Sequence, residues 1–157
     1  MPVRIRPQRQ ERAEKPVYRR MRADDLPPAM AERTKREHVP LVSFVREWDA
    51  WPDERRAMIA DAPTGDDADD LCRIAAVVHA LCDRVPVPAW VFDHRSEVDI
   101  AWGRNCVMEG FIWEQTVADA PAACAYHRVW FDREFVGIPS EHRRRRTGIR
   151  ITTAAVA

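Results

Sequence analysis

The sequence predicts a mainly α-helical protein, a single-domain bundle of about five to six short helices with disordered basic termini. Apolar residues recur at helical three-and-four spacing in several separate stretches. Prolines and glycines stand between these stretches, where they end one helix or allow the next to begin. A length of 157 residues with 46% hydrophobic residues is typical of a domain that buries one core without the support of disulfide bonds or a structural metal.

Charge divides the chain into three parts. Residues 1–23 form a basic arm with three prolines, and residues 139–157 form an Arg-rich tail, so we expect both to be disordered. Residues 24–138 form the predicted helical domain. The formal net charge is zero, but this domain carries about −10 and the two ends together about +10. Such ends can bind nucleic acid, lie on the acidic body, contact an acidic partner, or remain as solvated tails.

The stretch from Asp66 to Trp90 is predicted to organise the fold. Its apolar residues form one face of a helix, and Asp66 is the expected capping carboxylate of an acidic first turn. Val85-Pro86-Val87-Pro88 ends the helix, because proline lacks a backbone donor. Trp90 then anchors the returning chain. The predicted buried face consists of Leu71, Ile74, Ala75, Val78, Leu81 and Cys82.

Shorter helices are expected on both sides of this stretch. Pro40, Pro52 and Pro121 each stand at a position where a helix can begin, since the first turn does not need that N–H donor. Residues 93–103 have no clear period and are predicted to form a loop pinned by Trp102. The expected helices span residues 29–37, 41–50, 53–61, 105–119 and 121–127, with residues 133–136 compatible with one more turn. Residues 129–131 are too few for periodicity to distinguish a strand from a helical link.

The cysteines and the ends of the sequence bear on the compartment. All four cysteines lie in apolar helical patterns, and the N-terminus is Arg-rich without the apolar run of a signal peptide. We therefore expect reduced thiols and a cytoplasmic protein. No stretch approaches the roughly 18 consecutive apolar residues of a membrane-spanning helix, so we expect no membrane contact. The cysteines are Cys72, Cys82, Cys106 and Cys124.

Two matched spacings form the best metal candidate. His79-x-x-Cys82 and Cys124-x-x-His127 would each place two ligands on one helical face, and together they supply a two-Cys two-His set of the type that zinc favours. The alternative is that both thiols are small hydrophobic residues of the core. Neither pair has the glycine-containing turn of a structural zinc knuckle. The sequence therefore predicts no metal and no other cofactor, with this set as the exception to test.

A catalytic site is not predicted. Asp93, His94 and Asp99 lie in a loop close to tryptophans, where a histidine and carboxylates could act as general acid and base. A loop histidine beside a carboxylate is more often an exposed surface residue without a catalytic role. The five glycines stand alone, so no phosphate-binding glycine-rich loop is present, and the common hydrolase and metalloprotease motifs are absent from the sequence. We expect a protein that is not an enzyme.

Two sets of residues could bind a macromolecule. Aromatic side chains are the candidate contacts with a protein partner, although packing in the core is their ordinary role. Arginines of the two ends are the candidate contacts with nucleic acid, because they can neutralise phosphates. The candidate protein contacts are Trp90, Phe92, Trp102 and Trp130. The candidate nucleic-acid contacts are Arg4, Arg6, Arg19, Arg20, Arg143, Arg144, Arg145 and Arg146.

Several short motifs follow one another in a recognisable order between residues 24 and 136. They are Asp24-Asp25-Leu26-Pro27-Pro28, His38-Val39-Pro40-Leu41, Phe44-Val45-Arg46-Glu47, Arg56-Ala57-Met58-Ile59, Thr64-Gly65-Asp66, Val85-Pro86-Val87-Pro88-Ala89-Trp90, Ala118-Asp119-Ala120-Pro121-Ala122-Ala123 and Val129-Trp130-Phe131-Asp132. Their order resembles a helical module of actinobacterial regulatory proteins, which often follows a Xre-type helix-turn-helix. Some members of that family are antitoxin-like proteins encoded beside toxins.

The resemblance implies a non-enzymatic protein that binds another protein. On this interpretation the chain is an antitoxin-like or regulatory component of an actinobacterial or mobile-element system, and a toxin is one kind of partner. This chain has a basic arm where that family often carries a helix-turn-helix, which departs from the pattern of members that read DNA. The alternative is a small nucleic-acid-associated regulator that uses its basic arms.

Overall fold

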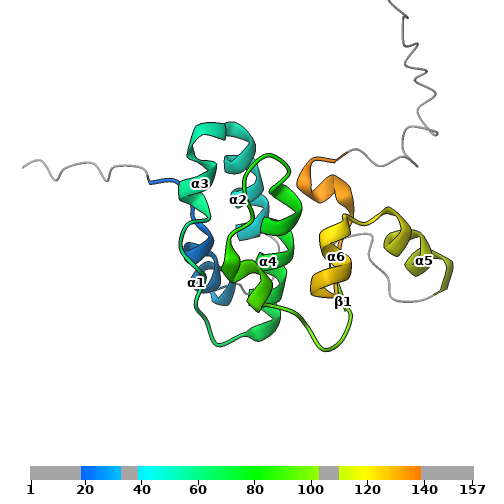
Figure 1. Ribbon diagram of the computed structural model, residues 1–157. Coiled ribbons are helices and arrows are strands. Elements are labelled where there is room, and N and C mark those ends of the chain that lie inside the picture. The colour runs from blue at the N-terminus through cyan, green and yellow to red at the C-terminus, as the bar shows by residue number, and fades with distance from the viewer. Residues whose placement is uncertain (1–18, 33–38, 103–109, 139–157) are drawn as a thin grey trace, which may run out of the picture.

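The computed structural model describes residues 19–32, 39–102 and 110–138 (Figure 1). Within these ranges the chain forms six α-helices, four short 3-10 helices and one two-stranded sheet. The predicted mainly α-helical class is therefore confirmed. The α-helices are α1 Leu26–Ala31, α2 Val39–Ala50, α3 Arg55–Met58, α4 Ala68–Leu81, α5 Gly110–Asp119 and α6 Ala122–His127. The other elements are η1 Ala23–Asp25, η2 Pro52–Glu54, η3 Ala89–Asp93, η4 Arg133–Val136, β1 Ile100–Ala101 and β2 Val129–Trp130.

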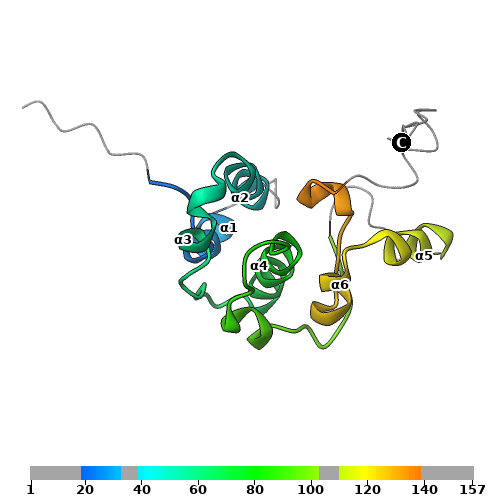
Figure 2. The same cartoon turned by 45° about the horizontal axis from the view of Figure 1, so that its top comes forward.

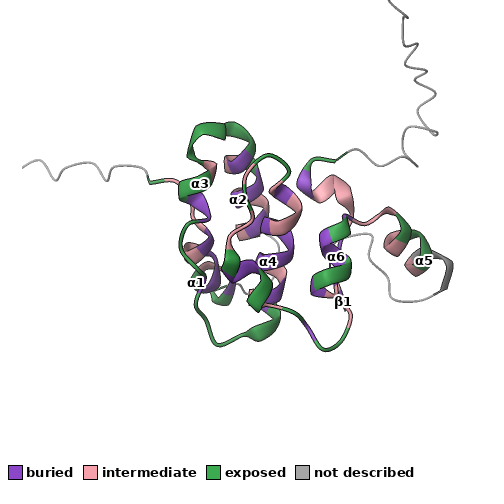
Figure 3. Cartoon of the chain, in the orientation of Figure 1, coloured by how far each residue is buried: buried purple, intermediate pink, exposed green. Residues whose placement is uncertain are grey.

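Helix α4 lies at the centre, with α1, α2 and α3 on one side and α6 on the other (Figures 1 and 2). The predicted helix is confirmed, but its burial is wider than one face. Ala76 and Val77, which fall off the predicted stripe, are fully buried, whereas Leu71 is only half-buried. Figure 3 shows α4 coloured mainly as buried. This difference follows from packing on both sides, since a helix enclosed by neighbours buries more than one stripe.

The cap of α4 lies one residue later than predicted. The Asp67 carboxylate, rather than that of Asp66, accepts the backbone N–H of Asp70 at 3.1 Å. Asp67 has an extended backbone, which is the usual geometry of an N-cap residue. From this position the side chain satisfies one of the free N–H groups of the first turn.

The N-terminal segment is attached to the body earlier than the sequence predicts. Residues 19–23, assigned above to the disordered arm, lie against α2 and η2. The Met21 N–H donates to Glu47 Oε2 at 2.8 Å, and Ala23 is fully buried. Helix α1 begins at Leu26, before the predicted 29–37, because prolines are tolerated in a first helical turn. Residues 33–37 of that prediction lie outside the described residues.

Helix α2 follows the sequence pattern closely, and the helix predicted after it does so in part. Helix α2 buries the residues that stand at helical spacing, and its C-terminal Trp48 is among the largest buried side chains. The third predicted helix is shorter than expected and consists of η2 followed by α3. Its backbone leaves helical geometry at Ile59, which is nevertheless buried. The buried residues of α2 are Leu41, Phe44, Val45 and Trp48.

A short parallel sheet joins two distant segments. Ile100 pairs with Val129 and Ala101 with Trp130. The N–H of Trp102 donates to the carbonyl of Trp130 at 2.8 Å. Residues 129–131, which the sequence left open between a strand and a helical link, thus contain a strand at 129–130. The prediction of an irregular loop over 93–103 is wrong at residues 100–101, which form β1.

Helix α5 lies beyond α6, at the side of the body (Figure 2). None of residues 113–119, whose side chains are described, is buried. Its contacts with the body include the Trp113 and Trp130 rings, with centroids 5.6 Å apart, and an ion pair between Asp119 and Arg133 at 3.9 Å. Residues 103–109, which complete the predicted 105–119 helix, lie outside the described residues. Within the described chain no helix has both the length and the apolar character needed to cross a bilayer.

Candidate functional site

Histidines and aromatic residues meet where α4, η3 and α6 come together. We refer to His79, Phe92, Tyr126 and His127 as the histidine–aromatic cluster. His79 lies in the last turn of α4, Phe92 in η3, and Tyr126 and His127 at the end of α6. Helix α6 and η3 both pack against α4. The fold therefore brings together three segments that are far apart in the sequence.

A chain of hydrogen bonds fixes the protonation of the two histidines. His127 Nδ1 lies 2.6 Å from the carbonyl oxygen of His94, and a carbonyl can only accept, so Nδ1 carries the proton. In a neutral imidazole the other nitrogen, Nε2, is then an acceptor. It lies 3.0 Å from His79 Nδ1, which must donate to it. His79 therefore has its own proton on Nδ1 and an unprotonated Nε2.

Burial keeps this pair neutral. His127 has no exposed surface, and burial is the main reason that its pKa falls to about 4, with nearby His79 and His94 adding to the effect. The hydrogen bond to the His94 carbonyl acts in the opposite direction. Burial also lowers the pKa of His79. Both imidazoles are consequently neutral near pH 7.

An exposed pair of aromatic rings packs against His79. Phe92 is 44% exposed and Tyr126 is 38% exposed. Their ring centroids are 5.5 Å apart and the rings are nearly perpendicular, at 88°. The Tyr126 hydroxyl donates to the carbonyl oxygen of Phe92 at 3.0 Å, and the Arg95 guanidinium lies 6.0 Å from the Tyr126 ring centroid. We call Phe92 and Tyr126 the aromatic pair.

The rings of the cluster are packed directly against one another. The His79 ring centroid lies 5.2 Å from that of Phe92 and 6.1 Å from that of Tyr126, with both rings inclined at 75° to it. These are ordinary edge-to-face distances. An aromatic cage for an ammonium group would need space between the rings. The cluster therefore offers an outer surface for contact.

Two of the four proposed metal ligands meet in this cluster. His79 on α4 and His127 on α6 are in contact, with His79 Nδ1 3.0 Å from His127 Nε2. Among the described residues, no group of three or more His, Cys, Asp or Glu side chains could hold a metal ion. Burial and nearby Asp83 raise the pKa of Cys82 to about 11, which disfavours the thiolate that binds metals. Cys124 is buried in α6.

The four aromatic residues predicted to bind a partner have different positions. Trp90 is 9% exposed and its indole N–H donates to the Ile59 carbonyl at 3.0 Å. Trp102 is buried among phenylalanine rings, and Trp130 is half-buried. Phe92 alone of the four is exposed. Sequence reasoning missed Tyr126, although it stands next to His127.

Asp99, one of the loop residues considered above for acid–base chemistry, has a structural role. Its carboxylate accepts two hydrogen bonds from Arg128 and one from the Trp130 indole, each at about 3 Å. These hydrogen bonds, first that of Arg128, lower the pKa of Asp99. His94 contributes its backbone carbonyl to the histidine chain. Asp99 thus ties the strand region together.

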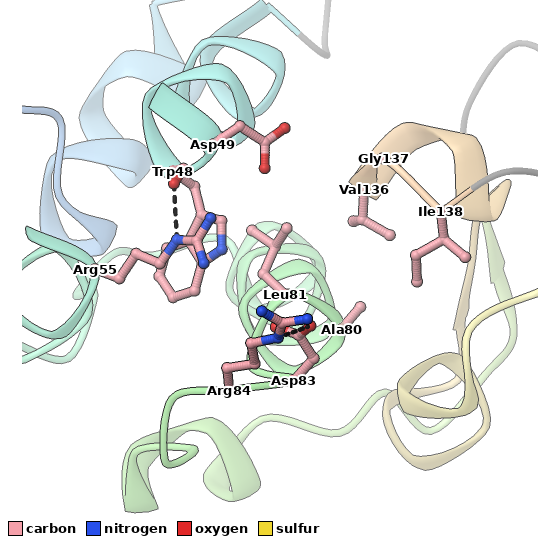
Figure 4. Close-up of a pocket in the computed structure, with 10 residues that line it drawn as sticks. All are labelled: Trp48, Asp49, Arg55, Ala80, Leu81, Asp83, Arg84, Val136, Gly137 and Ile138. Atoms are coloured by element: carbon pink, nitrogen blue, oxygen red, sulfur yellow. Dashed lines mark hydrogen bonds and ion pairs between the residues drawn. The ribbon is translucent and has the colours of Figure 1, made fainter. Parts of the chain in front are cut away.

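An open cleft of about 330 Å³ is bounded by three parts of the chain: the C-terminal end of α2, the C-terminal end of α4, and η4 (Figure 4). Its wall includes Leu81 on one side and Val136 on the other. Arg55 is held at the rim, because its Nε–H donates to the Trp48 carbonyl at 2.9 Å and its guanidinium lies 5.3 Å from the Trp48 ring centroid. The cleft is lined by Trp48, Asp49, Arg55, Ala80, Leu81, Asp83, Arg84, Val136, Gly137 and Ile138.

Of the candidate nucleic-acid contacts, the structure describes Arg19 and Arg20, and both contact the acidic body. Arg19 pairs with Asp25. The Arg20 guanidinium lies 3.4 Å from the Trp51 ring centroid, and its Nε is 3.5 Å from the Glu54 carboxylate. The other candidate nucleic-acid contacts lie outside the described residues; they are Arg4, Arg6, Arg143, Arg144, Arg145 and Arg146.

Fold and cluster together define a small, mainly α-helical domain that presents an aromatic pair over a neutral histidine pair. Comparisons of this chain with protein-family models, with curated proteins and with solved structures find no match.

Proposed function

We propose that this chain is a non-enzymatic partner-binding protein, antitoxin-like or regulatory, that contacts a protein partner through the aromatic pair. The observation that carries the proposal is the exposure of Phe92 and Tyr126 side by side on a fixed support. Large aromatic residues dominate the binding energy of protein interfaces. The sequence resemblance to antitoxin-like modules supports the same class of partner.

The support of the aromatic pair favours binding. The Tyr126 hydroxyl is hydrogen-bonded to the Phe92 carbonyl in η3. Neighbouring His127 is hydrogen-bonded to the carbonyl of His94, two residues further along the chain. These contacts join α6 to η3 in the free protein. Side chains that are already fixed lose less conformational entropy on binding, which adds to affinity. The aromatic pair is therefore a suitable centre for an interface.

The proposal is tested by affinity purification from the native host with a matched pair of variants. Phe92→Ser removes the exposed ring of the aromatic pair, whereas Val39→Ser removes a similarly exposed apolar side chain on α2. We expect the wild type and Val39→Ser to retain a stoichiometric protein partner that Phe92→Ser loses. Equal recovery by all three, or no stoichiometric partner for the wild type, contradicts the proposal.

The nucleic-acid alternative makes a different prediction. If the basic ends bind phosphates, affinity for mixed-sequence DNA falls steeply with rising salt and disappears when both ends are removed. Phe92→Ser would then leave DNA binding unchanged. Arg19 and Arg20 already face carboxylates of the body, so this alternative depends on the remaining arginines.

A further inference from the structure

We propose that the partner donates a hydrogen bond, from a neutral N–H or O–H group set among apolar atoms, to Nε2 of His79. This inference rests on the proposed function, since it assumes that a protein covers the aromatic pair. It adds the chemistry that such a partner must present. The interface would then combine an apolar contact with one specific polar contact.

The first step is the direction of the histidine chain. The His94 carbonyl can only accept, so His127 donates to it through Nδ1–H, and His79 in turn donates to His127 through its own Nδ1–H. This leaves Nε2 of His79 as an acceptor. No described residue donates to this atom, and it is not among the enclosed side-chain atoms without a partner. Nε2 therefore reaches solvent in the free protein.

The second step is the position of His79 within the patch. Its ring contacts both members of the aromatic pair. A partner large enough to cover Phe92 and Tyr126 also covers His79. An acceptor that loses water without gaining a donor costs about 1–3 kcal/mol. A purely apolar partner surface is disfavoured for this reason.

The third step concerns charge. A carboxylate from the partner would place an acceptor against an acceptor. A cationic donor that packs on the Tyr126 ring would meet the positive charge of Arg95, whose guanidinium lies 6.0 Å from the centroid of that ring. A neutral donor avoids both conflicts. Serine, threonine or tyrosine hydroxyls, amide groups and the tryptophan indole have this chemistry.

Protonation provides a signature of this contact. A protonated His79 carries a proton on Nε2 and can no longer accept. The titratable and charged residues of the segments packed against α4 at this end are Tyr126 and His127 of α6, Asp93 of η3, and His94 and Arg95 directly after η3. Burial lowers the pKa of His79 below its ordinary 6.5, so we expect binding to be lost only as the pH falls below 6.5.

Short random peptides displayed on phage and selected on the full chain serve as the probe. Peptides that require Phe92 are then measured against the wild type, His79→Gln and His79→Phe. Glutamine keeps an acceptor oxygen and a donor for His127, whereas phenylalanine keeps only the ring shape. We expect the selected peptides to share a neutral donor, and His79→Phe to weaken them about tenfold or more while His79→Gln restores much of the loss.

Removing the donor from the peptide should weaken its binding to the wild type and leave its binding to His79→Phe unchanged. Wild-type affinity should also fall as the pH is lowered below 6.5, and that of His79→Gln should not. Imidazole nitrogen NMR of the wild type needs no variant: we expect the proton of His79 on Nδ1, and a shift of Nε2 when peptide is added.

The failures are distinguishable. Peptides that require Phe92 but bind the wild type and His79→Phe equally overturn this inference and leave the proposed function intact. The absence of any Phe92-dependent peptide removes support for both. A His79 proton on Nε2 in the free protein overturns the assignment directly.

Discussion

Acidification should destabilise this protein through His127. An unfolded histidine binds a proton at its ordinary pKa of 6.5, but the folded chain resists protonation of His127 until about pH 4. Because the unfolded state binds more protons across this window, stability falls as pH falls through it. One pKa unit corresponds to about 1.4 kcal/mol, so the loss from His127 reaches about 3 kcal/mol at pH 4.

Urea unfolding, followed by tryptophan fluorescence at several pH values from about 7.5 to about 4, measures this loss. His127→Gln is the matched variant, because an amide can donate to the His94 carbonyl but does not titrate. Between about pH 7.5 and about pH 4, we expect the free energy of unfolding to fall by about 3 kcal/mol less in the variant than in the wild type. This difference does not depend on the stability of the variant at neutral pH. Burial lowers the pKa of His79 too, so some dependence remains in the variant.

Equal loss of stability in the wild type and His127→Gln over this range would refute the reasoning. The depressed pKa of Asp99 acts in the same direction, but its contribution is lost below the ordinary carboxyl pKa of 3.8. It therefore lies outside the histidine window. A pKa of His127 near 6.5 by NMR would refute the reasoning independently.

Three substitutions test the fold. Asp67→Ala removes the cap of α4 and should lower the free energy of unfolding by about 1 kcal/mol in chemical denaturation; exposed Asp69→Ala, which removes a charge from the same turn, should cost less, and an equal cost would contradict the cap. Trp90→Phe loses a buried indole hydrogen bond and should cost about 1–3 kcal/mol by the same assay. Arg20→Ala loses its contact with the Trp51 ring and should cost about 0.5–1 kcal/mol with a change in the fluorescence of that tryptophan; an unchanged spectrum would count against the contact.

The sequence predicted the elements that depend on local patterns. The apolar spacing of α2 and α4 and the prolines that flank them are short-range features, so the helices lie close to where they were expected. The sheet was missed in part because two-residue strands leave no period to detect. Pairing of Ile100 with Val129 depends on distant chain segments meeting. Such contacts arise from packing that a one-dimensional pattern does not contain.

The candidate site shows the same division. Aromatic residues were predicted as partner contacts, but the sequence could not distinguish buried Trp90 from exposed Phe92, two positions apart. The matched Cys/His spacings predicted a shared helical face for each pair, and the two histidines of these pairs do meet. The set was considered as a candidate zinc site and not as a hydrogen-bonded pair, because spacing gives a shared face and not the geometry of a hydrogen bond. The tautomers follow only from the position of the His94 carbonyl.

The parallel register of β1 and β2 makes the chain between Ala101 and Val129 an excursion that returns close to its starting point. Adjacent strands lie about 5 Å apart, so both ends of this segment are anchored by the same small ladder. Helix α5 lies within it, and residues 113–119 contribute no buried side chain. A reporter domain grafted in place of α5 should leave the central helix undisturbed, which offers a site for biosensor construction away from the aromatic pair.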